Sequence, residues 1–137
     1  MNYGLDSGGA KGISLSCAEL LEAGVGATTV ESTRVGYGTP TEHSRCPTQT
    51  VMVGLKYGPD TQLMSFAPVC AALAEWTERS VAAPTTLGPQ IGSRSLDSEV
   101  ACPQGYVLTS VEGAWTGVGS GLAATLRGVC TVVNTAL

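Results

Sequence analysis

The sequence predicts an all-β fold of short antiparallel strands joined by tight turns. Gly is 18 and Pro 7 of the 137 residues, and only 13% of the residues are charged, a composition that favours strands and turns over helices. Val51, Val53 and Leu55 lie at alternate positions, as in a strand with one buried face. Similar segments also recur along the chain, so we expect one domain built from a repeated unit.

The repeat is clearest in two segments that open with Cys-Pro and close with Val-Cys, residues 46–70 and 102–130. Their opening cysteines are 56 residues apart, and Val35-Gly36 and Ile91-Gly92 precede them at the same distance. Several matches at fixed offsets are hard to obtain by chance. We therefore expect a unit of roughly 56 residues.

A third copy is present only as its tail, because Asn2–Asp6 leading to Cys17 matches Lys56–Asp60 leading to Cys70. The pattern predicts about two and a half repeats in a single domain, residues 1–137. The predicted divisions are a repeat tail at 1–20, repeat two at 21–73 and repeat three at 74–137.

Each complete copy predicts two strands and a connecting turn. A strand over 51–56 precedes a turn at 57–60, and a strand over 107–111 precedes a Gly-rich turn at 113–121. Residues 70–81 fit two structures, since Ala, Leu and Trp mixed with Glu suit a short helix or the end of a strand; residues 18–23 share this pattern. We expect the apolar residues four positions before the closing cysteines in the core, namely Ile13, Phe66 and Leu126.

The five cysteines indicate an oxidising compartment and a secreted protein, since the chain has no Cys-x-x-Cys motif or Cys/His cluster typical of a metal site. The cysteines of each complete copy bracket two strands and a turn, so the expected disulfides are Cys46–Cys70 and Cys102–Cys130. Cys17 is left over. It predicts an intermolecular bond, a reactive thiol, an inert buried thiol, or a chain cut from something longer.

The segment Cys102-Pro-Gln-Gly-Tyr106, with the closing Leu126-x-x-Val129-Cys130, resembles the vitelline membrane outer layer protein 1 family and its bacterial look-alikes. The resemblance implies a β-prism, the fold shared with jacalin-type lectins, in which three antiparallel sheets face a common core. It implies that one sheet is closed by the chain's own residues 131–137 or keeps an open edge for another subunit. The chain lacks the family's paired aspartates and Trp-rich stretch, so no activity on amino-sugar oligomers is carried over.

The best candidates for a ligand-binding surface are two predicted Tyr-Gly-x-Asp turns, because an aromatic face and a carboxylate suit a sugar. An exposed tryptophan would extend this platform, although packing in the core is the commoner role of Trp76 and Trp115. The candidate residues are Tyr3, Asp6, Tyr57, Asp60 and Trp115.

The sequence predicts no catalytic residue, cofactor or metal. His43, beside Glu42, is the only histidine, and a solvated turn residue is its simplest interpretation. A net charge of −4 with seven scattered Lys and Arg residues argues against nucleic acid as a partner. The chain has no apolar run near the ~18 residues of a membrane-spanning helix, so we expect no membrane insertion.

Three functions stay open. Low charge, many glycines and an odd cysteine favour a secreted structural or matrix-type protein that self-associates or joins a larger assembly. Its partners would be copies of itself or the missing half-repeat on another chain. The second function is a carbohydrate-binding, lectin-like module with glycan partners. The third is a glycan-acting enzyme, which needs two carboxylates roughly 5 to 10 Å apart.

Overall fold

A computed structural model gives the structure of the protein. The residues that the structure describes are 2–5, 12–21, 24–31, 35–36, 42–58, 65–78, 81–92, 95–116 and 123–133.

The described residues form strands and one short helix, and the prediction of an all-β fold is confirmed. The strands are β1 (Asn2–Leu5), β2 (Gly12–Leu21), β3 (Gly24–Glu31), β4 (Val35–Gly36), β5 (Glu42–Arg45), β6 (Thr50–Gly58), β7 (Ser65–Ala72), β8 (Thr86–Leu87), β9 (Ser98–Ala101), β10 (Tyr106–Thr116) and β11 (Ala123–Val132); the helix is α1 (Leu73–Thr77).

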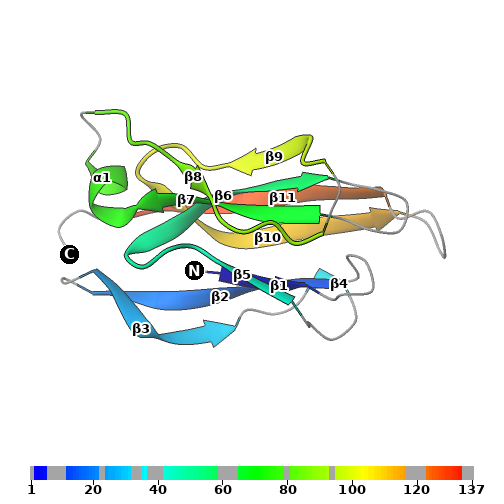
Figure 1. Cartoon of the computed structure of the whole chain (residues 1–137), viewed down its shortest axis with the longest axis horizontal. Helices are drawn as coiled ribbons and strands as arrows, with labels where there is room; N and C mark the ends of the chain where they lie inside the picture. Colours follow the sequence, from blue (N-terminus) through cyan, green and yellow to red (C-terminus); the bar gives the residue numbers. More distant parts are fainter. Residues whose placement is uncertain are drawn as a thin grey trace.

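The strands make three antiparallel sheets. The N-terminal sheet has the order β3-β2-β1-β5, with β4 also paired to β2; the middle sheet has the order β8-β7-β6-β9; and the C-terminal sheet is the hairpin β10-β11. Figure 1 shows the N-terminal sheet, in blue and cyan, along one side of the molecule, with hairpins β6–β7 and β10–β11 along the other. The long strands follow the long axis of the molecule.

The hairpins β6–β7 and β10–β11 pair in the same register. In each, the closing cysteine lies opposite the third residue of the first strand, and a β-bulge adds one unpaired residue directly after it. The equivalent pairs are Met52–Cys70 and Gly54–Val69 in the first hairpin, and Leu108–Cys130 and Ser110–Val129 in the second.

The strands that flank the first two hairpins are also equivalent. In each case a segment that follows the hairpin returns to pair with both of its strands. Within these returning segments, residues 56 positions apart have equivalent partners, as Val30 and Thr86 do. The pairs with the second strand are Cys17–Val30 and Ile13–Val35 in the N-terminal sheet, and Cys70–Thr86 and Phe66–Ile91 in the middle sheet; the pairs with the first strand are Asn2–Arg45 and Gly54–Ala101.

This pairing corrects one detail of the match between the repeat copies, the equivalence of Tyr3 and Tyr57. Tyr3 lies opposite Leu15, two positions before Cys17, whereas Tyr57 lies opposite Phe66, four positions before Cys70. The shared Tyr-Gly letters are therefore two positions out of register. Both tyrosines lie inside strands, so the predicted turn does not begin at either of them.

The two segments with an ambiguous pattern adopt different structures. Residues 73–77 form helix α1, which buries Trp76, so the helical interpretation holds for that copy. Residues 18–21 instead continue strand β2, which pairs with β3 as far as Leu21–Gly24. The direct return of the chain into β3 favours the strand, because a continued ladder pairs the backbone groups of both segments.

The core lies between the sheets. Phe66 is fully buried and its ring stacks on Tyr57, with 6.5 Å between the ring centroids. Leu126 is also buried, so two of the three predicted core residues are confirmed. The cluster around them draws on all three sheets and contains Leu15, Met52, Leu55, Ile91, Cys102, Leu108 and Val111.

Candidate functional site

Two disulfides join the pairs that the spacing of the cysteines predicts. Cys46 is bonded to Cys70 and Cys102 to Cys130, with 5.7 Å between the Cα atoms in both. Each bond ties the end of a flanking segment to the second strand of the next hairpin. Such bonds are typical of an oxidising, extracellular-type environment.

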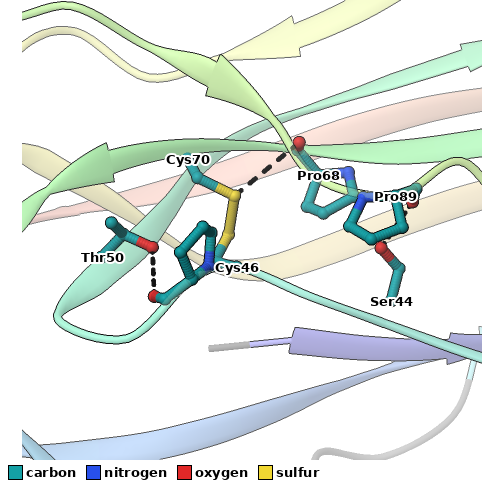
Figure 2. Close-up of a disulfide and its surroundings, with 7 residues drawn as sticks. Ser44, Cys46, Thr50, Pro68, Cys70 and Pro89 are labelled. Atoms are coloured by element: carbon teal, nitrogen blue, oxygen red, sulfur yellow. Dashed lines mark hydrogen bonds between the residues drawn. A yellow bond between two sulfur atoms is a disulfide. The ribbon is translucent and has the colours of Figure 1, made fainter.

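The surroundings of Cys46–Cys70 fix the chain on both sides of the bond (Figure 2). Ser44, which is 2% exposed, donates its hydroxyl to the carbonyl of Pro89 at 2.5 Å. Thr50 donates its hydroxyl to the carbonyl of Pro47, also at 2.5 Å. The first bond joins β5 to the segment that follows β8, and the second adds to the turn after Cys46, where the N–H of Thr50 also donates to the carbonyl of Pro47 at 3.1 Å.

Cys17 is the free cysteine. It lies in β2 opposite Val30, in the place that Cys70 occupies opposite Thr86. Its side chain is partly buried and packs against the same core cluster as the disulfide-bonded Cys46 and Cys130. Cys17 therefore occupies the position of a closing cysteine without an opening cysteine bonded to it.

Among the described residues, both edges of the C-terminal sheet are open. Within the described part of the chain, β10 pairs only with β11, and neither strand has an outer neighbour. Val129 is 37% exposed, whereas the equivalent Val69, in the hairpin that β8 flanks, is 7% exposed. Cys130 is likewise partly exposed, whereas the equivalent Cys70 is fully buried. The missing flanking strands thus leave these positions uncovered.

One surface of this sheet is polar. Thr109 and Thr131 share a hydrogen bond between their hydroxyls at 2.8 Å. Arg127 lies opposite Glu112, with 3.6 Å between Nε and the carboxylate. Both charged side chains are mostly exposed, and exposed pairs of this kind contribute little to stability. Val132, by contrast, exposes 51% of its surface at the end of β11.

The predicted sugar-binding residues are not shown to form a common surface. Tyr57 is 8% exposed and packs on Phe66, so its selection as a surface residue was wrong: the strand alternation that places Leu55 in the core also places Tyr57 there. Tyr3 lies in β1, and Trp115 lies in β10 opposite Ala124. Asp6 and Asp60 lie outside the described residues.

The remaining candidates have structural roles or stand alone. Trp76 is buried and donates its indole N–H to the carbonyl of Tyr106. His43 is exposed on β5, opposite Gly4, rather than in a turn. The described residues hold no group of three His, Cys, Asp or Glu side chains suited to a metal ion.

A hollow beside α1 was not foreseen from the sequence. It has a volume of about 360 Å³ and is lined by Ala74, Glu75, Glu78, Val81, Ala82, Ala83 and Pro84. Gln104 bonds to the backbone of this segment, donating to the carbonyls of Glu78 and Val81 at 2.7 Å and accepting the N–H of Ala83 at 3.1 Å. Gln104 thus supplies hydrogen bonds to backbone groups of residues 78–83, as a neighbouring strand would.

Comparison with known proteins finds no matching family model, no matching curated protein and no matching solved structure. Among the described residues, no helix has the length and apolar character needed to cross a membrane. The geometry of the described residues alone therefore defines the candidate site. Its parts are the open edges of β10 and β11, the exposed Val129 and Val132, and the free thiol of Cys17.

Proposed function

We propose that this protein is a secreted structural domain that joins a larger assembly through the edges of its C-terminal sheet. We further propose that its three sheets are a β-prism built from the sequence repeats. The equivalent pairing of the N-terminal and middle sheets supports the repeat. In this arrangement, each of the first two hairpins is completed by the segment that leads to the next hairpin.

The open edges of β10–β11 are the observation that carries the proposal. An edge strand presents unpaired N–H and C=O groups, and proteins that avoid pairing protect such edges with charges, proline or a covering element. Here the described residues provide no covering element, and the single Arg127–Glu112 pair is neutral overall. Exposed valines at positions 129 and 132 add apolar surface that strand addition would bury.

The structure gives less support to carbohydrate binding. A sugar platform needs exposed aromatic rings, and the described aromatic side chains Tyr57, Phe66 and Trp76 lie in the core. Tyr106 is 37% exposed, but it lies outside the two Tyr-Gly-x-Asp segments on which the sugar-binding hypothesis rests. Assembly through strand edges uses features that are present together in one sheet.

Sizing the protein from its native source, with and without reductant, tests the proposal. We expect a species larger than the 13.9 kDa chain under non-denaturing conditions. Val129→Lys should weaken the assembly by at least about tenfold, because a charge on an edge strand opposes further pairing. Val30→Lys is the matched control, since Val30 is 69% exposed on the edge strand of another sheet. A monomer at all concentrations would contradict the proposal.

A further inference from the structure

Three features have no pairing strand or disulfide partner among the described residues: the outer edge of β11, the outer edge of β10 and the thiol of Cys17. For each of the other two sheets, one segment pairs with both edges of the hairpin and supplies the cysteine that bonds to the next hairpin. The course of that segment therefore indicates what would complete the C-terminal sheet.

Residues 86–102 show this course in the middle sheet. Thr86 and Leu87 pair with β7, and Ile91 bridges to Phe66 through two hydrogen bonds of 2.8 and 2.9 Å. Residues 98–101 then cross to pair with β6. Finally Cys102, whose N–H still donates to the carbonyl of Val53 in β6 at 2.8 Å, bonds to Cys130 in the next hairpin. One segment thus covers both edges of one hairpin and closes a disulfide on another.

The described residues between 30 and 46 follow the same order of pairing around the N-terminal sheet. Val30 and Val35 pair with β2, and residues 42–45 pair with β1. Cys46 then bonds to Cys70 in the following hairpin. The course is the same although the two segments differ in sequence, so it is set by the positions of the strands and cysteines.

We propose that a third segment of this kind, supplied by a partner chain, adds to the edges of β11 and β10 and forms a disulfide with Cys17. This inference rests on the proposed assembly function and names the partner's chemistry. The segment is extended, carries two short strands about ten residues apart, and ends in Cys-Pro. Its first strand pairs at Val129–Cys130 and its second at 110–113, the equivalents of the pairs made by β8 and β9.

In a second copy of the same fold, the two segments of this kind among the described residues are already in use. Its residues 30–46 and 86–102 already cover its own N-terminal and middle sheets. Each also carries a cysteine that is already bonded, to Cys70 or to Cys130. The partner proposed here is a chain that carries an unused segment of this pattern.

The exposures of equivalent residues agree with the addition of a strand to β11. Flanked by β8, Val69 and Cys70 are 7% and 0% exposed. Their unflanked equivalents Val129 and Cys130 are both more exposed, Val129 at 37%. Addition of a strand to β11 should lower the exposure of both residues toward the values in the completed sheet.

A synthetic peptide with the sequence of residues 84–103 serves as the probe, with its cysteine activated as a mixed disulfide with 5-thio-2-nitrobenzoate. The thiolate of Cys17 attacks the peptide sulfur, the new S–S bond forms, and the aromatic thiolate leaves with the bonding electrons while the Cys17 proton passes to water. The released thiolate gives the rate, and peptide mapping gives the site. Hydrogen exchange reports which strands gain protection.

Three controls accompany the probe: a scrambled peptide that keeps the cysteine, a peptide with proline at the positions of Ile91 and Val100, and the Cys17→Ser protein. The matched peptide should react with Cys17 at least about tenfold faster than the scrambled or proline peptides, because strand pairing raises the local thiol concentration. It should protect amides at 110–113 and 129–130, and Cys17→Ser should retain this protection without the covalent product.

Equal rates for matched and scrambled peptides, protection confined to the middle sheet, or a Cys17–Cys17 dimer in place of the peptide product would each overturn the inference. A native assembly that forms although the peptide fails would leave the proposed function standing and refute only this partner. A protein that takes up the peptide but is monomeric in its native source would refute the assembly function alone.

Discussion

The indole N–H of Trp76 donates a hydrogen bond of 2.5 Å to the backbone carbonyl of Tyr106, which lies 30 residues further along the chain. Trp76 is 6% exposed and belongs to an apolar cluster with Val51, Val53 and Val107. The bond fixes helix α1 against the first residue of β10. It therefore couples the end of the middle hairpin to the start of the C-terminal hairpin.

Trp76→Phe should lower the free energy of unfolding by about 1 to 3 kcal/mol, because the carbonyl of Tyr106 loses its donor in a partly buried position. Urea denaturation measures the change. Tyr106→Phe is the matched control, since it removes a hydroxyl from a residue 37% exposed and keeps the backbone carbonyl. An equal loss in both variants would assign the effect to packing instead of the hydrogen bond.

Gln104→Glu tests the role of the side-chain amide beside α1. A carboxylate keeps the acceptor for the N–H of Ala83 but cannot donate to the carbonyls of Glu78 and Val81. We expect faster hydrogen exchange at Ala83 and a loss of about 1 to 3 kcal/mol in stability. Glu75→Gln, at a neighbouring exposed residue, should leave exchange at Ala83 unchanged. Unchanged exchange in Gln104→Glu would show that water replaces the amide.

Much of the fold could be predicted from the sequence because its signals are local or repeat. The Cys-Pro openings and Val-Cys closings marked both hairpins and both disulfides. Alternation along 51–56 marked β6, and the spacing before each closing cysteine marked Phe66 and Leu126 as core residues. The opening signals recur after 56 residues, from Cys46 to Cys102, and the closing signals after 60 residues, from Cys70 to Cys130.

The parts that sequence reasoning missed depend on contacts between distant residues. The register of β1 is set by its pairing with both β2 and β5, which outweighs the Tyr-Gly match. Tyr57 was assigned to a turn because Gly58 follows it, yet the ladder with β7 extends to Gly58–Ser65. The interaction of Gln104 with 78–83 spans more than twenty residues, and no local pattern indicates it.

Gly105→Ala should destabilise the turn between Cys102 and β10. Gly105 has a φ of 88°, and the N–H of Tyr106 bonds to the carbonyl of Pro103 at 3.0 Å to close the turn. A Cβ in this region costs about 1 to 2 kcal/mol, and thermal or urea unfolding should show a loss of that size. Gly105→Asn should lose less, because Asn tolerates positive φ; the reverse order would show that side-chain volume, not backbone strain, sets the cost.

The two disulfides offer a comparison in which chain entropy is nearly constant. Their cysteines are 24 and 28 residues apart, so each bond should restrict the unfolded chain by about 3.5 kcal/mol. Each bond also joins one buried and one partly exposed cysteine, since Cys70 and Cys102 are buried and their partners Cys46 and Cys130 are partly exposed.

Replacing Cys46 and Cys70 with Ala should therefore lower the free energy of unfolding by nearly the same amount as replacing Cys102 and Cys130, because each pair leaves one buried position unfilled and the two closed loops are similar in length. Guanidinium denaturation of both double variants measures the difference. Cys17→Ala is the control for loss of a thiol without loss of a bond, and its effect should be the smallest of the three. A larger loss for the second pair would mean that the C-terminal hairpin depends on its disulfide more than on packing, as expected of a sheet whose edges await a partner.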